Sequence, residues 1–321
     1  MKSLTRFNLG LDRFSGLYLW AAFIVVFSVW QPHLFPTSGT LHSVAAQQAV
    51  GAMMAIAVLI PLAAGAYDLS IGATINFSTI LVCVLQVNEH WPMWYAIVAS
   101  VACCSLIGIV NGFLVVKAGL NSFIATLGVA AIVGALQTVV SDDSQPLPPT
   151  SNAWTNLTQV QWLGFQAVFW YFIALAVIVW WLLAHTPAGR YLHAIGGNAE
   201  AARLSGVAVG QWTWLSLIAS STICGIAGVL YASLSGPSLE FGAGRLLPAY
   251  AAAFLGSTQL QPGRFNVWGT VISIYLLAIG VKGLELKWPT DSWISDLFEG
   301  VALLVAVALA VQSSRRRART R

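Results

Sequence analysis

Two acidic residues, Asp68 and Glu299, lie inside strongly apolar stretches of this 321-residue sequence. A carboxylate in such surroundings could relay protons or couple transport to an ion, because charge is costly in lipid and is kept there mainly for function. Each residue also has a structural interpretation, which we favour. Asp68 could cap the first turn of a helix, and a cap at a helix break could also line a passage. Glu299 could form a hydrogen bond between helices.

No arrangement of residues indicates covalent catalysis or metal binding. The histidines are His33, His42, His90, His185 and His193. They are scattered without metal-ligand spacing. The sequence contains no GxSxG motif and no Gly-Lys pair, so it has no P-loop for nucleotide. We therefore expect a chain that is not an enzyme and has no cofactor of its own. If ATP drives it, ATP and Mg must be bound by another subunit.

Uncharged polar side chains are more frequent than charged ones within the apolar stretches. Amides and hydroxyls can exchange hydrogen bonds with a hydroxylated solute without holding it too tightly. They also join transmembrane helices to one another, which is the simpler explanation for any single residue. The candidates for a passage or a helix break are Asp68, Ser70, Asn76, Asn111, Phe123 and Thr126.

The composition indicates a membrane protein. Hydrophobic residues make up 58% of the chain and charged residues only 8%, whereas soluble domains contain about 25% charged residues. A soluble fold could not bury so much apolar surface, so lipid must cover much of it. The net charge of +4 does not indicate nucleic-acid binding, because five of the 15 Lys and Arg residues fall within the last seven residues. It favours contact with anionic lipid instead.

We predict a single all-α transmembrane domain over residues 1–321, a helical bundle of about ten spans with some short or broken helices. The expected spans are 16–32, 44–65, 69–87, 93–116, 122–140, 163–184, 212–234, 246–258, 265–283 and 293–312. The second and third are separated only by Gly65-Ala66-Tyr67-Asp68. The eighth is short enough to be a half-helix, since a full span needs about 20 apolar residues.

The distribution of charge predicts the orientation. With the N-terminus inside, twelve Lys and Arg residues lie on the cytoplasmic side, and only Arg245, Lys282 and Lys287 lie outside. This asymmetry obeys the positive-inside rule. We therefore expect a multi-pass protein of the plasma (bacterial inner) membrane, with both termini, the loop 185–211 and the basic tail 313–321 in the cytoplasm.

The loop 185–211 contains a short polar stretch with the features of a helix. Asn198 is a good N-cap, Glu200 falls in the first turn and Arg203 near the end. Gly206 follows as the residue that ends the helix. A helix over 198–205 would be unstable alone in water, so we expect it to rest against a partner.

Four segments match a known family in the right order over residues from about 55 to 275. They are Tyr67-Asp68-Leu69-Ser70-Ile71-Gly72, then Asn111-Gly112-Phe113-Leu114-Val115 with Ser122-Phe123-Ile124-Ala125-Thr126-Leu127-Gly128, then Gly189-Arg190-Tyr191 with residues 194–206, and residues 225–230. They resemble the "IDLSVG", "NG-L-V … PFIATLG" and coupling segments of ribose-type ABC sugar permeases. The sequence departs from this pattern at Gly65-Ala66 in place of paired glycines, at Ser144-Gln145-Pro146 in place of "GQP", at Tyr67 in place of Ile and at Ser122 in place of Pro.

The resemblance implies a ten-helix permease of the vitamin-B12-importer-like fold, working as a homo- or heterodimer. Two cytoplasmic ATPase domains of an ABC ATPase partner would drive it, and a soluble sugar-binding protein would deliver a monosaccharide or similar small polar solute. The short helix would dock in a groove of the ATPase. The residues expected to couple the two subunits are Gly196, Gly197, Asn198, Glu200, Ala201, Ala202, Arg203, Ser205 and Gly206.

Two other classes of function stay open. One is a secondary transporter driven by an ion gradient, with Asp68 or Glu299 as the coupling group. It would work as one chain without ATP. The other is an intramembrane enzyme, for which the sequence offers no candidate nucleophile, metal site or acid–base pair.

Overall fold

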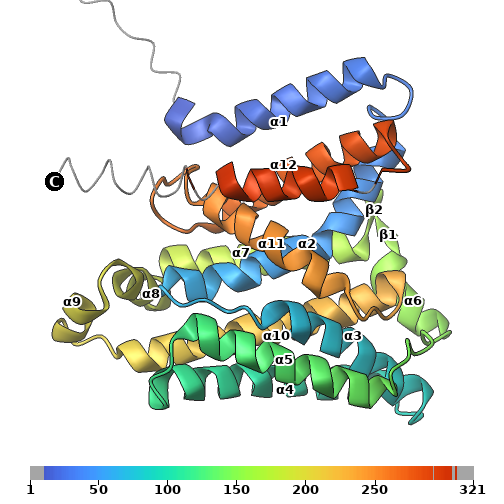
Figure 1. Ribbon diagram of the computed structural model, residues 1–321. Helices are drawn as coiled ribbons and strands as arrows, with labels where there is room; N and C mark the ends of the chain where they lie inside the picture. The colour runs from blue at the N-terminus through green and yellow to red at the C-terminus, as the bar shows by residue number, and fades with distance from the viewer. Residues whose placement is uncertain (1–10, 292, 306–307, 309–321) are drawn as a thin grey trace, which may run out of the picture.

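The structure, a computed structural model, describes residues 11–291, 293–305 and 308. Its long helices lie side by side and run between two ends of the molecule (Figure 1). One end carries α8 and α9, and the other carries α6 and a small hairpin. The first described turn of α1 and the last of the helix over residues 293–305 both lie at the α8–α9 end (Figure 1).

The long helices follow the predicted spans closely. The first five are α1 (Leu11–Trp30), α2 (Ser38–Ala63), α3 (Ile71–Val87), α4 (Met93–Gly112), which continues as the π-helical turn η1 (Phe113–Lys117), and α5 (Ser122–Ser141). The others are α7 (Ala167–His185), α10 (Val209–Ser235), α11 (Phe241–Gly256), α12 (Val267–Lys287) and the helix over residues 293–305.

Six helices of the described chain are long and apolar enough to cross a membrane, and Gly16–Trp30 and Ile71–Val87 are shorter apolar helices. The prediction of an all-α membrane bundle is confirmed at this level. The count of ten spans stays a prediction, as does the vitamin-B12-importer-like fold. The tenth span, 293–312, and the tail 313–321 lie partly or wholly outside the described residues.

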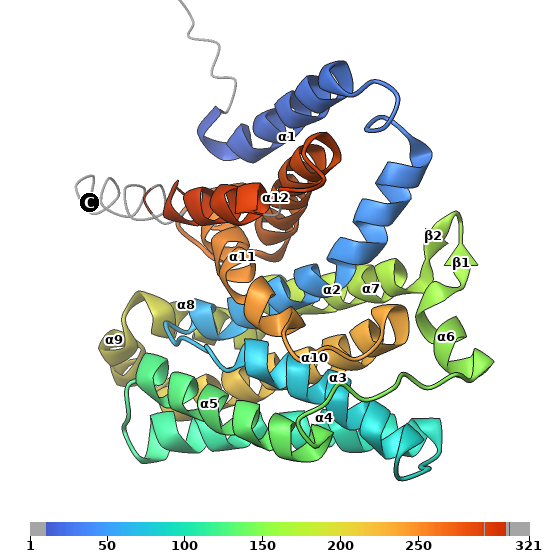
Figure 2. The same cartoon turned by 45° about the vertical axis from the view of Figure 1, so that its right-hand side comes forward.

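Helix α2 forms the centre of the bundle. Its residues are buried on all sides from Gln48 to Ala63, and it packs against α7, α10, α11 and α12. Helix α10 packs in turn on α3 and α4, while α1 lies at the edge of the molecule against α12 (Figure 2). Close approach depends on small residues: a side chain at Gly228 of α10 would meet the carbonyl of Ile75 on α3. Small residues at such crossings are typical of membrane helices.

The structure contains elements that the sequence did not predict. The outer connection folds into α6 (Asn152–Gln159) and a hairpin of β1 (Gln161–Trp162) and β2 (Phe165–Gln166). Leu163 and Gly164 both have positive φ, as a tight two-residue hairpin turn requires. The sixth predicted span, 163–184, was therefore wrong at its start, because its first four residues belong to this hairpin. Helix α8 (Pro187–Gly197), which begins on a proline, was also missed.

Candidate functional site

The predicted polar helix is confirmed as α9 (Ala199–Leu204). The side chain of Asn198 accepts a hydrogen bond from the Ala201 N–H at 3.0 Å, as expected of an N-cap. Gly206, with φ of 83°, ends the helix. Its N–H bonds the carbonyl of Arg203, and the next N–H, of Val207, bonds the carbonyl of Ala202, which together form a Schellman motif. The local sequence thus determines both ends of α9.

The exposed face of α9 carries one surface ion pair and one exposed apolar side chain. Glu200 and Arg203 form a surface ion pair at 3.5 Å, which adds little stability. Ala201 is exposed, and Ala202 is the helix's buried residue. Leu204, which the sequence analysis did not select, has 83% of its surface exposed. Its position at the end of a recognised helix could have drawn attention to it.

Helix α8 fastens this segment to the bundle. Leu192 and Ile195 are buried among the core residues. The ring of His193 lies between two carbonyl oxygens, with Nδ1 2.7 Å from that of Gly189 and Nε2 3.0 Å from that of Phe265, just before α12. Helix α8 thus joins α9, which packs against it, to the membrane helices.

The break between α2 and α3 is the second candidate site. Gly65, with φ of 74°, ends α2, and α3 begins six residues later at Ile71. The N–H groups of Tyr67, Asp68 and Leu69 donate to the hydroxyls of Ser122, Tyr250 and Thr126, at 3.1, 3.0 and 3.0 Å. Such side-chain partners are what non-helical backbone needs within a membrane protein.

Asp68 is fully buried at this break. Its Oδ1 accepts from the backbone N–H of Ser70 at 3.1 Å and from the Ser70 hydroxyl at 2.6 Å. The Asn111 amide then donates to the same hydroxyl at 2.7 Å. The predicted cap is therefore displaced: Ser70 is the residue that precedes α3, and Asp68 holds it in place from two residues away.

The predicted pathway residues divide into two groups. Asp68, Ser70, Asn111 and Thr126 meet at the break, and Phe123 lies beside it with its ring 6.4 Å from that of Tyr67. Asn76 does not belong there. Its amide donates to the Leu239 carbonyl at 2.8 Å and accepts from the Gly242 N–H, so it holds α3 to the first turn of α11.

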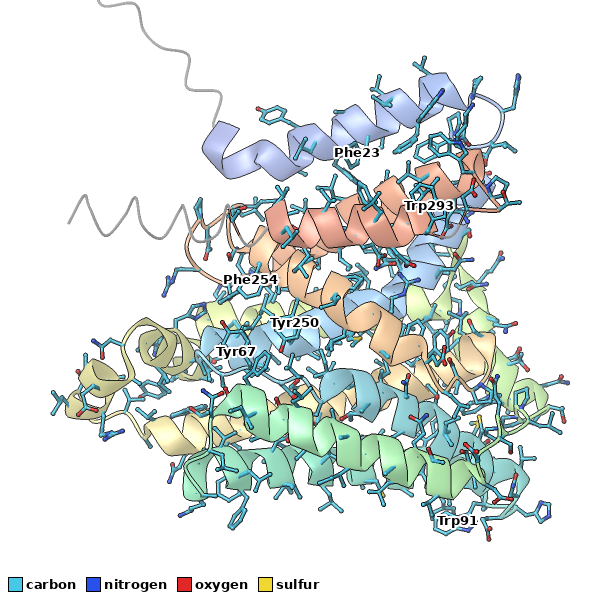
Figure 3. All side chains as sticks on the ribbon, viewed as in Figure 1. Phe23, Tyr67, Trp91, Tyr250, Phe254 and Trp293 are labelled. Carbon is cyan, nitrogen blue, oxygen red and sulfur yellow. The ribbon has the colours of Figure 1, made fainter. Side chains whose placement is uncertain are left out.

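Aromatic rings continue from the break along one face of the bundle. Tyr67 stacks on Tyr250 with ring centroids 6.5 Å apart, and Phe254 follows at 6.4 Å from Tyr250. Figure 3 shows Tyr67, Tyr250 and Phe254 in this order along the break and α11. Tyr67 is 40% exposed, although it sits beside a buried polar network. The sequence analysis missed Tyr250, which no local pattern distinguishes from other aromatic residues.

The two candidate sites touch one another. A side chain at Gly196 of α8 would clash with the carbonyl of Ala63 at the end of α2 and would lie 3.3 Å from the N–H of Gly65. No such obstacle lies near Gly197, where a methyl group would meet open space. Backbone therefore meets backbone where the α8–α9 segment reaches the break.

The sequence belongs to a known group of membrane components. A family model described as "Branched-chain amino acid transport system / permease component" matches residues 40–307. The chain belongs to this family. The permease is 30% identical over 292 residues to the "Ribose import permease protein RbsC" of Escherichia coli (strain K12), which covers 88% of this chain and 89% of the relative.

Two further relatives of the permease, both from Escherichia coli (strain K12), are named for other sugars. The "L-arabinose transport system permease protein AraH" is 29% identical, and the alignment covers 95% of this chain and 92% of the relative. The "D-allose transport system permease protein AlsC" is 26% identical, and the alignment covers 94% of this chain and 93% of the relative. "PsaBC from Streptococcus pneumoniae in complex with Fab" superposes with a TM-score of 0.44 and 14% identity over 91% of this chain and 94% of that one, a likeness too weak to define the fold.

The resemblance to ribose-type permeases that the motifs indicated is confirmed by these relatives. Within the permease, two departures from the motif pattern lie in contact. The Ser122 hydroxyl, at the position where the pattern has proline, accepts the N–H of Tyr67, where the pattern has isoleucine. A proline side chain offers no such acceptor. This bond comes from the backbone of residue 67, so it depends on Ser122 and not on the tyrosine side chain.

Proposed function

We propose that the permease is the membrane subunit of an ATP-binding-cassette importer for a monosaccharide or a similar small polar solute. The family match supports the transport role, and the relatives named for ribose, arabinose and allose support the solute class. The contact between Gly196 and the α2–α3 break is the observation on which the mechanism rests. It connects the segment that ends in the exposed helix α9 to an interruption of the bundle.

In this proposal the α8–α9 end faces the cytoplasm, and α9 docks on an ABC ATPase subunit that binds ATP and Mg. Leu204 supplies the apolar anchor, and Ala201 allows close approach. The coupling residues are those predicted from the sequence: Gly196, Gly197, Asn198, Glu200, Ala201, Ala202, Arg203, Ser205 and Gly206. The opposite end receives solute from a soluble binding protein, and a second permease copy completes the passage across ten spans.

The mechanical step follows from the contacts. Closure of the ATPase dimer displaces α9, α8 moves with it, and Gly196 presses on the end of α2. The break then shifts the ring of Tyr67 against that of Phe123 on α5. The break is held to α5 and α11 because the hydroxyls of Ser122 and Tyr250 accept the N–H groups of Tyr67 and Asp68. Two such breaks facing one another would alternately open and close a passage. The chain itself carries out no covalent chemistry.

Substitution of Leu204 by glutamate tests the docking step. Because the side chain is largely exposed, the permease should fold normally, while a charge placed in an apolar contact should weaken binding of the ATPase subunit at least tenfold. The measurement is co-purification of the ATPase with the tagged permease from membranes, together with ATP-dependent uptake. Both should fall.

Leu147→Glu is the matched control, since Leu147 is 73% exposed and lies in the connection between α5 and α6. It should leave ATPase binding unchanged. Normal co-purification and uptake with Leu204→Glu would exclude α9 as the docking helix.

A further inference from the structure

A cavity of about 600 Å³, with six charged residues in its lining, opens at the end of the molecule opposite α8 and α9. It lies between the start of α11, the end of α12 and the start of the helix over residues 293–305, near Trp293 in Figure 3. Its volume is within the range of roughly 300–1,000 Å³ that small-molecule sites occupy. Sequence analysis assigned no role to this region apart from that of Glu299.

Two pairs of opposite charge line the cavity. Arg245 lies 3.8 Å from Glu299, and Lys282 lies 3.6 Å from Glu285. The Glu299 side chain is only 18% exposed, so it is partly withdrawn from solvent. Paired charges of this kind present donors and acceptors side by side. A hydroxyl group, which both donates and accepts, can bond to both members of such a pair.

A narrow recess extends the cavity toward α2, and the two share Arg245, Lys282, Glu285 and Glu299. Gln48 of α2 lines this recess and is only 7% exposed. Across the described residues, the structure gives its side-chain amide no hydrogen-bond partner. The amide therefore faces the recess with its hydrogen-bonding groups free of protein partners. A bound solute that reaches the recess would supply that partner.

The charges of the lining select the class of solute. Besides the two pairs, Asp291 and Asp296 line the cavity, so four carboxylates stand against two cationic groups. This excess of negative charge repels anions such as sugar phosphates. Apolar residues also line the cavity, and among them the indole of Trp288 offers a flat surface for a sugar ring.

We propose that this cavity binds an uncharged, polyhydroxylated solute of monosaccharide size, with Gln48, Arg245 and Glu299 in direct contact. The inference rests on the proposed function for its solute class. It goes further by naming the cavity as the site where the permease first binds the solute. Because the binding protein would select the cargo, the cavity accepts several monosaccharides with low selectivity.

Protection of an introduced thiol tests the site. Ala278 lines the recess and is half-buried, so Ala278→Cys would place a reactive group there. The background carries Cys103→Ser, since the other three native cysteines are buried. With the full-length permease in lipid nanodiscs, D-ribose, L-arabinose or D-allose should slow alkylation by N-ethylmaleimide at least threefold at saturation. D-Ribose 5-phosphate should not.

Gln48→Leu should raise the sugar concentration needed for half-protection about three- to tenfold, as expected for one lost hydrogen bond. The matched control is Gln86→Leu, because the Gln86 amide bonds the Val82 carbonyl on α3 and lies outside the cavity. Absence of protection by all three sugars, equal protection by the phosphate, protection by D-glucosamine alone, or no effect of Gln48→Leu would each overturn the proposal.

The measurement uses neither ATP nor transport. Failure of the ATPase to bind would therefore overturn the proposed function without affecting this result. Failure of protection would remove the cavity as a solute site and leave the ATP-driven permease intact.

Discussion

At the residue scale, the hydroxyls around the α2–α3 break accept the N–H groups that carbonyls of the preceding turn would accept in a continuous helix. Three consecutive N–H groups there receive partners from α5 and α11. In lipid, each unsatisfied backbone group would cost several kcal/mol, so an interrupted helix requires such side chains. Ser122, Thr126 and Tyr250 are therefore part of the break itself, although they are distant from it in sequence.

Asp68 should contribute more to stability than any exposed acidic residue. Asp68→Ala would remove the acceptor for both the N–H and the hydroxyl of Ser70 and would disturb the Asn111 bond. Each buried group left unsatisfied costs about 1–3 kcal/mol, so we expect a loss of about 2–4 kcal/mol. The measurement is unfolding in detergent followed by tryptophan fluorescence.

Asp68→Asn keeps one oxygen that can accept from Ser70, so its loss should be smaller, about 1 kcal/mol. Glu89→Ala, an exposed position between α3 and α4, should leave stability unchanged. Equal stability of Asp68→Ala and the unaltered protein would contradict the network.

At the element scale, the adjacent glycines of α8 provide a matched pair of substitutions. A methyl group at Gly196 would press on the backbone of Ala63, whereas one at Gly197 would meet open space. Overpacking against backbone typically costs 1–3 kcal/mol. We expect Gly196→Ala to reduce ATP-driven uptake in proteoliposomes at least tenfold while the ATPase stays bound, and Gly197→Ala to change uptake less than twofold. Similar uptake by both variants would show that this contact does not transmit movement.

Elements with strong local patterns were predicted well. Apolar length fixed the long helices, and the cap, charge and glycine positions fixed α9 within one residue at each end. Helix α8 was missed because its sequence contains three glycines and few apolar residues. Leu192 and Ile195 face the core, but two residues are too few to reveal a helical period. The hairpin at 161–166 was missed because its aromatic residues prolong an apolar span, and only the backbone conformation of Leu163 and Gly164 separates them.

The candidate site was predicted less completely, because its contacts join distant elements. Asp68, Ser70, Asn111 and Thr126 were found as polar residues in apolar stretches. Asn76 met the same criterion, yet it holds another helix start. Tyr250, and Gln48 as the unpartnered amide of the cavity, could not be distinguished from sequence. Their importance depends on which groups face them after folding.

At the scale of the whole molecule, the proposed ATPase-docking helix and the proposed solute cavity lie at opposite ends. The α8–α9 end carries the exposed helix and the break that it touches, while the opposite end carries the cavity. Helix α2 connects them, because Gln48 in its first half lines the recess and Ala63 at its end meets Gly196. A displacement of this buried helix would therefore reach both ends.

The source of energy distinguishes the proposed importer from a secondary transporter. In the latter, Asp68 or Glu299 would bind the driving ion. Oδ1 of Asp68 bonds Ser70 and Glu299 lies beside Arg245, whereas Oδ2 of Asp68 has no hydrogen-bond partner among the described residues. We expect the permease alone in proteoliposomes to show no uptake of D-ribose, L-arabinose or D-allose under a proton or sodium gradient. Uptake should need the ATPase subunit, ATP and Mg, and should persist when the gradients are collapsed by ionophores. Gradient-driven uptake by the single chain, lost in Asp68→Asn or Glu299→Gln, would establish the secondary transporter instead.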